Sequence, residues 1–118
     1  MKYMLLIHGN QQTWDALSAM GMETVYAAHR GLIEELTTSG ELVAAQGLTT
    51  ADARVVRVVG GAPTVTDGPF SEAKEVLAGY YLVDCASLDR ATELAGRLPE
   101  APYSSIEIRA LIEPYAQG

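Results

Sequence analysis

Residues 2–8 (KYMLLIH) carry apolar side chains at both odd and even positions. The side chains of a strand alternate between its two faces, so this segment is predicted to form a strand that is apolar on both sides. Residues 79–84 (GYYLVD) repeat the pattern. The two segments together predict a sheet with apolar side chains on both of its faces.

Three other segments place apolar residues at helical spacing. Residues 13–20 form a short predicted helix with Thr13 as its N-cap. Residues 23–39 form a longer one, and residues 88–98 form a third, which begins after the N-cap Ser87. The apolar stripe of the long helix consists of Val25, His29, Leu32 and Leu36. We expect the two longer helices to pack on a common core.

Shorter apolar segments complete the predicted strands, at residues 41–48, 53–59, 64–66 and 105–112. Gly60-Gly61 predicts a tight hairpin between the second and the third of them. Arg54 and Arg57 fall on opposite faces of their strand, which favours a place near a sheet edge. The order of the elements predicts an α+β, ferredoxin-like sandwich with an inserted β-hairpin. The whole chain, residues 1–118, is expected to form a single domain.

Right-handed crossovers would place both long helices on one face of this sheet. The opposite face is then left without cover, although the strands at residues 2–8 and 79–84 are apolar on both sides. Exposed apolar surface is unfavourable by about 25 cal/mol per Å². We therefore expect a homodimer in which two copies pack sheet against sheet. The alternative is that the inserted hairpin folds over the face.

Composition and charge narrow the classes of partner. The 118 residues include 8 basic and 15 acidic ones, which give a formal net charge of -7. Such a chain repels phosphate backbones and anionic lipid surfaces, so neither nucleic acid nor membrane is an expected partner. The single cysteine, Cys85, excludes an internal disulfide, and two histidines with one cysteine are too few for a zinc site. We expect a cytoplasmic protein with neither a metal nor a cofactor.

Residues 66–75 (TDGPFSEAKE) hold the most distinctive motif of the chain. Asp67 can cap the turn that follows it, Gly68 permits a positive φ, and Pro69 fixes its own φ. The motif is either a rigid connector or a preformed loop that holds Asp67 and Glu72 at the mouth of a pocket.

This motif resembles the signature of the DGPF proteins, a branch of the YCII-related family, and the similarity extends over nearly the whole chain. It includes the first seven residues, the helix end Glu34-Glu35-Leu36, and residues 79–84 and 104–109. The resemblance implies that the protein forms a dimeric α/β-barrel and is bacterial. It also implies dehydrochlorinase-like or isomerase-like chemistry in some relatives, and many DGPF genes lie beside those of extracytoplasmic-function sigma factors.

His29 is the candidate base. On an apolar helix stripe, it is either a satisfied core group or a site residue whose burial tunes it for proton transfer. In the wider family, a helix histidine ahead of a Leu and a Gly helix stop is the suspected general base, paired with an aspartate. His29, Leu36 and Gly40 match that pattern, but the following strand has no Asp. Glu41 or Asp67 is expected to take its place.

The predicted activity is therefore a cofactor-free isomerisation or elimination of a small organic molecule. His29 would abstract a proton, Asp67 or Glu41 would orient it, and Arg54 or Arg109 would stabilise an anionic intermediate. The catalytic candidates are His29 and Asp67, and the substrate-binding candidates are Glu41, Arg54, Phe70, Glu72, Lys74, Tyr80 and Arg109. The alternative function is a noncatalytic accessory or ligand-sensing protein in sigma-factor regulation.

Overall fold

The computed structural model of the chain describes residues 1–67 and 75–112. The candidates Phe70, Glu72 and Lys74, with the turn Gly68-Pro69, lie outside the described residues. The elements are β1 (Lys2–Gly9), α1 (Gln11–Met20), α2 (Met22–Ser39), β2 (Leu42–Gly47), β3 (Arg54–Val59), β4 (Ala62–Asp67), β5 (Val76–Asp84), α3 (Leu88–Gly96) and β6 (Ile106–Ala110). None of the helices in this part of the chain has the length and apolarity needed to cross a membrane.

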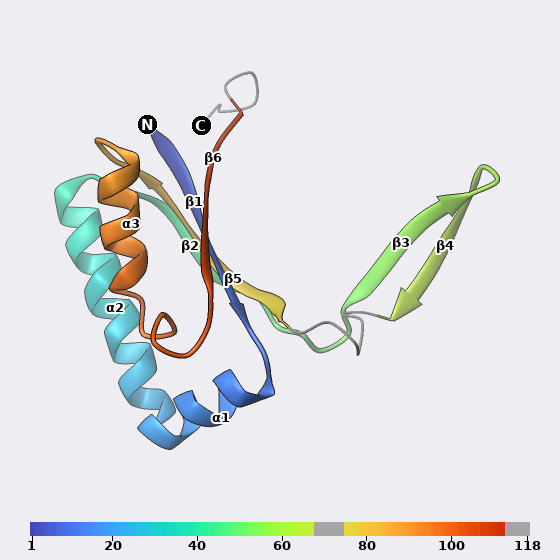
Figure 1. Cartoon of the computed structure of the whole chain (residues 1–118), viewed down its shortest axis with the longest axis horizontal. Coiled ribbons are helices and arrows are strands. Elements are labelled where there is room, and N and C mark those ends of the chain that lie inside the picture. The colour runs from blue at the N-terminus through green and yellow to red at the C-terminus, as the bar shows by residue number, and fades with distance from the viewer. Residues whose placement is uncertain (68–74, 113–118) are drawn as a thin grey trace.

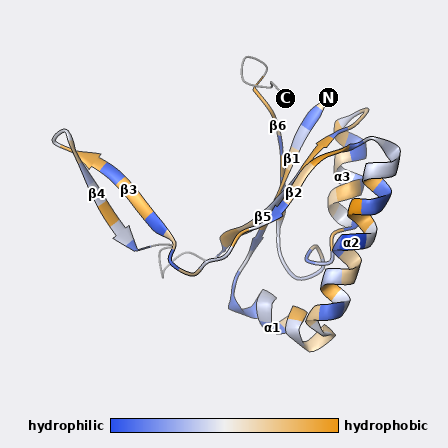
Figure 2. Ribbon diagram, turned by 180° about the vertical axis from the view of Figure 1, so that it is seen from behind, coloured by the Kyte–Doolittle hydropathy of each residue, from blue (hydrophilic) through white to orange (hydrophobic). Residues whose placement is uncertain are grey.

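Four strands form one antiparallel sheet in the order β2-β5-β1-β6. Helices α2 and α3 lie side by side on one face of this sheet, and α1 connects β1 to α2 at one end (Figures 1 and 2). This arrangement confirms the predicted α+β, ferredoxin-like fold. The sheet of the single chain is open and does not close into a barrel.

The core lies between the helices and the sheet. The buried stripe of α2 contains Val25, Leu32 and Leu36, as the periodicity predicts. Alternate residues of β1 and β5 point toward the helices and are buried. The main cluster of buried side chains comprises Tyr3, Leu5, Ile7, Leu32, Leu36, Tyr81, Val83, Cys85, Ala91, Leu94, Ala95 and Leu98.

Two predicted helix boundaries are wrong, each for a local reason. Helix α1 begins at Gln11 because Asn10 is its N-cap: Asn10 Oδ1 accepts from Thr13 N at 3.1 Å, and Asn10 N donates to Thr13 Oγ1 at 3.2 Å. Thr13 therefore completes a capping box instead of starting the helix. The predicted cap Ser87 is confirmed, but α3 ends at Gly96, two residues before Leu98.

The sheet face opposite the helices remains uncovered by the described residues. The register pairs Leu6 with Tyr80 and Met4 with Leu82 on this face, and all four side chains are half-buried. Glu107 and Arg109 of β6 lie opposite Leu6 and Met4 on the same side. We call these six residues the open face. Its four members on β1 and β5 confirm that these two strands carry apolar side chains on both sides of the sheet.

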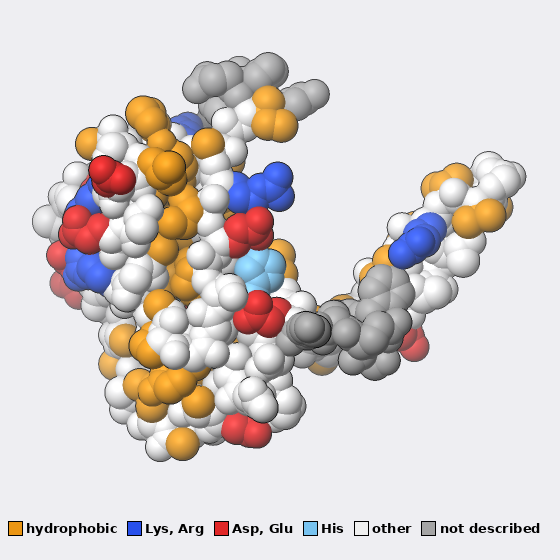
Figure 3. Space-filling model, viewed as in Figure 1, with side chains coloured by type: hydrophobic (Ala, Val, Ile, Leu, Met, Phe, Trp, Pro, Cys, Tyr) orange, Lys and Arg blue, Asp and Glu red, His pale blue; other side chains and the backbone are white. Residues whose placement is uncertain are grey.

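Strands β3 and β4 form a separate two-stranded sheet, which projects from the end of the molecule (Figures 1 and 3). We call residues 54–67 the arm. Gly60 and Gly61 form its tip with φ values of 58° and 81°, as a tight hairpin turn requires. Every residue of β4 is exposed, and the strands of the arm pack mainly on each other. The alternative that the hairpin folds over the open face is therefore wrong.

Candidate functional site

A pocket of about 630 Å³ lies between the sheet and helices α1 and α2. This volume falls within the range of small-molecule sites. Apolar side chains form most of its wall, among them Trp14, Leu17, Met22, Val25, Ile33 and Leu48. The sheet side of the pocket includes Gly47 and Gly79, which lie directly opposite each other on β2 and β5.

Close packing holds the Trp14 ring in the pocket wall. A Cβ atom added to Gly9 would come within 2.5 Å of the Trp14 ring, so the ring lies directly against the backbone at the end of β1. A side chain at position 9 would displace the ring. The absence of a side chain at Gly9 therefore helps to set the shape of the pocket.

His29 is the polar centre of the pocket. Its side chain projects from α2 on the apolar stripe and keeps 21% of its surface exposed. The Nε2 atom lies 2.7 Å from Oε2 of Glu100, and the Nδ1 atom lies 2.7 Å from the Tyr81 hydroxyl. A helix, a strand and a turn thus each supply one member of a hydrogen-bonded chain.

Glu100 is held in the turn that follows α3. Its carbonyl accepts hydrogen bonds from Ser104 N at 3.0 Å and from Ser104 Oγ at 3.2 Å. Only 8% of the residue is exposed, and the buried Oε1 atom has no hydrogen-bond partner among the described residues. A buried carboxylate is costly unless it is paired, so its contact with His29 is the main compensation that the structure provides.

Tyr81 completes the chain from the sheet. Burial and the nearby charge of Glu100 raise the pKa of its hydroxyl above the usual value, so the hydroxyl stays protonated at neutral pH. An ionised Glu100 only accepts hydrogen bonds, which assigns the proton to Nε2 of His29. The Nδ1 atom then accepts from the Tyr81 hydroxyl.

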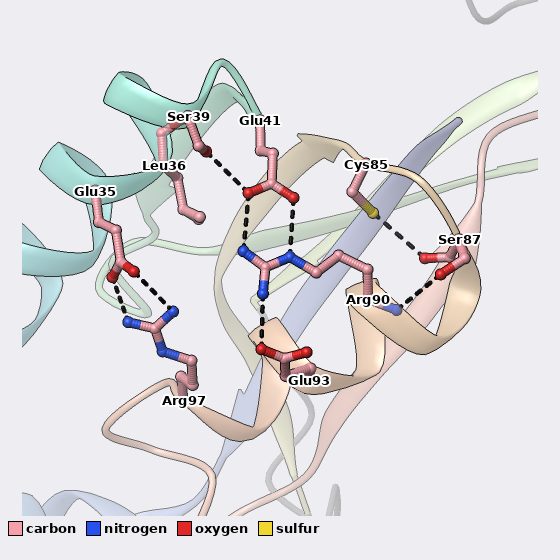
Figure 4. A network of polar contacts seen from close by, with 9 residues as sticks. All are labelled: Glu35, Leu36, Ser39, Glu41, Cys85, Ser87, Arg90, Glu93 and Arg97. Carbon is pink, nitrogen blue, oxygen red and sulfur yellow. Dashed lines mark hydrogen bonds and ion pairs between the residues drawn. The ribbon is translucent and has the colours of Figure 1, made fainter.

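Glu41 serves a different purpose from the predicted one. It accepts hydrogen bonds from Arg90 at 2.9 and 3.0 Å and from Ser39 at 2.9 Å (Figure 4). The Arg90 guanidinium and then the Ser39 hydroxyl lower the Glu41 pKa to about 2. Arg90 also binds Glu93, and Arg97 binds Glu35 next to this network. Glu41 therefore links the connection between α2 and β2 to α3, and its recorded partners do not include His29.

Other predicted site residues lie apart from His29. Asp67 ends β4, directly opposite Arg54 at the base of the arm. Arg54 borders a second hollow of about 370 Å³. Tyr80 and Arg109 lie on the open face, across the sheet from the pocket. The carboxylate that contacts His29 is thus Glu100, and neither Asp67 nor Glu41 occupies that place.

Sequence reasoning missed both partners of His29. Glu100 follows Pro99 in a turn, where no periodic pattern tells which element its side chain will meet. Tyr81 has the sequence pattern of an ordinary buried strand residue. A residue that faces the core and one that faces the pocket occupy the same alternate positions of β5, so the pattern does not distinguish them. A proline-bounded acidic residue after an apolar helix was the available signal, and it is weak because it does not show how α2 and α3 pack.

Fold and pocket define the class of this protein: a ferredoxin-like α+β chain with a histidine–carboxylate pair in an apolar pocket beside its sheet. The YCII-related domain matches residues 1–114, so the chain belongs to the YCII-related family. It is also 36% identical over 114 residues to an uncharacterised protein of Rhizobium meliloti (strain 1021), and the alignment covers 94% of this chain and 92% of that protein.

Proposed function

We propose that the pocket binds a small organic molecule and that His29 acts on it as a general base, without a cofactor. The observation that carries this proposal is the chain from Tyr81 through His29 to Glu100, with both contacts at 2.7 Å. A carboxylate that accepts from one imidazole nitrogen orients the ring and can stabilise the imidazolium that forms when the other nitrogen takes a proton. The arrangement therefore supports proton abstraction.

The reaction class follows from the atoms at this end of the pocket. A C–H bond next to a carbonyl breaks, its proton moves to Nδ1 of His29, and its electron pair moves onto the carbonyl oxygen as an enolate. The Tyr81 hydroxyl leaves Nδ1 and donates to that oxygen. Return of the proton to another carbon completes an isomerisation. Expulsion of a leaving group from the next carbon, with that proton, completes an elimination.

In this proposal Tyr81 stabilises the anionic intermediate, a role that the sequence analysis assigned to Arg54 or Arg109. Arg54 and Arg109 do not line the pocket. A protonated hydroxyl next to the base can stabilise the developing oxyanion by a hydrogen bond, and burial strengthens that bond. Glu100 stabilises the imidazolium that forms on His29. Substrate-binding roles for Arg54, Tyr80 and Arg109 have no support from the pocket geometry.

Isotope exchange tests the proposal with simple carbonyl probes in place of an identified substrate. Acetophenone-type ketones and cyclic enones in D₂O lose their α-protons to solvent, and NMR follows that loss. We expect the protein to accelerate exchange of at least one such probe by about 10²-fold or more, and His29→Gln to abolish the acceleration. The matched control is His8→Gln, because His8 also contacts a glutamate, Glu107 at 3.1 Å, but lies outside the pocket.

The same experiment separates the two functions. If probes bind to the pocket and none exchanges faster than in buffer, catalysis is disproved and the accessory or ligand-sensing function replaces it. If His8→Gln removes the exchange and His29→Gln retains it, the assigned base is wrong. The buried carboxylate beside His29 favours the enzyme, because a binding pocket alone does not require that charge.

We further propose that two copies pair through the open face as a homodimer. Its centre is apolar and half-buried, at Met4, Leu6 and Leu82. Its rim carries Glu107 and Arg109 two residues apart on one strand, so a two-fold axis can set each charge against its opposite in the other copy. A second copy is therefore the occupant that this face fits best.

The arm offers the second copy another surface. The register places Val56, Val58, Pro63 and Val65 on one side of the hairpin, and the three valines are 55 to 69% exposed. A two-stranded sheet alone is marginally stable, so this side requires a partner. The arm carries two arginines and one aspartate, whereas the rest of the chain is strongly acidic. This charge difference favours contact between the arm and another copy.

A further inference from the structure

We infer that the pocket selects a flat, uncharged ring compound with one carbonyl group, and that it rejects anions. The inference rests on the proposed function for the place of the reacting group, but its argument is the chemistry of the pocket wall. Three features carry it: the absence of cations from the lining among residues 1–67 and 75–112, the buried carboxylate of Glu100, and the paired glycines of the sheet.

The described part of the lining offers neutral hydrogen-bond donors but no cationic side chain to an anion. Among residues 1–67 and 75–112, no lysine or arginine borders the pocket, and the ionisable groups there are His29, Glu100 and two tyrosines. The arginines of α2 and α3 and of the turn after α3 are bound elsewhere: Arg30 to Glu23, Arg90 to Glu41 and Arg97 to Glu35. A carboxylate or phosphate ligand would lose its hydration without gaining a cation in return.

Glu100 strengthens this selection. It is more than nine-tenths buried, and its Oε1 atom lacks a hydrogen-bond donor within the described part of the chain. A second negative charge in the pocket would face that incompletely compensated carboxylate in a medium of low dielectric constant, where repulsion is strong. A cationic ligand gains little, because Oε1 is out of reach of solvent and Oε2 is already bound by His29.

The sheet supplies a flat surface for the ligand. Gly47 and Gly79 face each other across β2 and β5 and both line the pocket, so two adjacent positions present backbone without side chains. Trp14 and Tyr26 bring aromatic rings to the same cavity. Backbone planes and aromatic faces accept a planar ring better than a branched chain. The ring would lie here with its carbonyl directed toward His29 and Tyr81.

The test uses three one-ring probes of different charge: acetophenone, benzoate and benzylammonium. Trp14 is the only tryptophan of the chain, so its indole N–H gives one NMR signal that reports directly on the pocket. We expect acetophenone to shift this signal with a dissociation constant about tenfold or more below those of both ions. Equal or tighter binding of benzoate or benzylammonium would overturn the inference, and so would the failure of all three probes to move the signal.

A pair of glycine variants tests the flat surface. A Cβ atom at Gly47 or at Gly96 meets no other atom within 4 Å, so both alanine substitutions leave the packing intact. Gly47→Ala raises the sheet surface inside the pocket and should weaken acetophenone binding several-fold, whereas Gly96→Ala in α3 should leave it unchanged. Equal binding by both variants would contradict the flat surface.

The test of ligand selectivity and the test of catalysis can fail independently of each other. Neutral probes that bind without proton exchange would remove the catalytic proposal and leave the selectivity standing. Exchange that is faster for ketones carrying a carboxylate than for uncharged ketones would sustain the catalytic proposal and overturn the selectivity.

Discussion

Glu100 places a carboxylate oxygen 2.7 Å from Nε2 of His29, although the two residues lie 71 positions apart in the sequence. The contact joins the turn after α3 to the middle of α2. It therefore depends on how the two helices pack side by side on the sheet. The pair orients the imidazole so that its other nitrogen faces Tyr81.

Glu100→Gln tests the charge of this pair without changing its volume. The amide can still accept from His29 but cannot neutralise an imidazolium, so the transition state loses its counter-ion. We expect the rate of α-proton exchange to fall by about 10²-fold or more, with little change in probe affinity. Exchange rates and the Trp14 signal measure the two quantities separately. An unchanged rate would show that Glu100 has only a structural role.

Because Arg90 lowers the pKa of Glu41, the free energy of unfolding is expected to depend on pH, and the direction of the pKa shift gives the sign. The pKa of Glu41 is lowered from 4.5 to about 2 in the folded chain, so its contribution to stability is fully present above pH 4.5 and is lost as the pH falls toward 2. We expect Arg90→Met to lower the free energy of unfolding at neutral pH, because Glu41 loses the guanidinium that binds both of its carboxylate oxygens. The difference from the native chain should shrink on acidification, as urea titrations at several pH values would show.

The control for this prediction is Arg30→Met. Arg30 also binds a glutamate, Glu23 at 2.8 Å, but both side chains are more than half exposed. Exposed ion pairs contribute little, so this variant should change the free energy of unfolding by less than about 0.5 kcal/mol. If both variants behave alike at neutral pH, the Glu41–Arg90 pair does not have the stabilising role assigned to it.

The sequence predicts the fold because its patterns are local. Two-sided apolar strands, helical stripes and the glycine turn at residues 60–61 each follow from neighbouring positions, and the structure contains all of them. The handedness of the crossovers then predicts that both long helices lie on one face of the sheet, as α2 and α3 do. His29 is also recognisable, because a titratable residue interrupts an apolar stripe.

The partners of His29 do not follow from local patterns. Glu41 is the first acidic residue after α2, but α3 presents the Arg90 guanidinium to it, and this group binds both of its carboxylate oxygens. Glu100 reaches His29 because the chain turns back after Pro99. Such contacts between distant segments are decided by packing, which one sequence does not reveal.

Leu82→Arg tests the homodimer. Leu82 lies in the middle of the open face, opposite Met4, and an arginine there would place a charge inside the proposed interface. We expect this variant to sediment as a monomer where the native chain sediments as a dimer. Leu88→Arg is the control, since Leu88 is 54% exposed on α3, away from the open face. A native chain that sediments as a monomer would refute the pairing.

The arm permits a comparison between two adjacent residues. Val58 and Val59 are 69% and 65% exposed in the single chain, but the alternation of β3 places them on opposite sides of the hairpin. Val58 shares its side with Val56, Pro63 and Val65, and Val59 shares the other side with polar residues such as Thr64 and Arg57. Threonine keeps the shape and strand propensity of valine but has a hydroxyl in place of one methyl group.

If the side that bears Val58 packs on a second copy, Val58→Thr buries an unpaired hydroxyl in the interface and Val59→Thr does not. We expect Val58→Thr to weaken the dimer by about tenfold, a penalty near 1.4 kcal/mol, and Val59→Thr to leave it unchanged. Dilution series in the analytical ultracentrifuge give both constants. Because the two valines are almost equally exposed in the single chain, a difference in thermal stability of the monomer does not explain such a result. Equal constants for the two variants would mean that the arm stays outside the dimer interface.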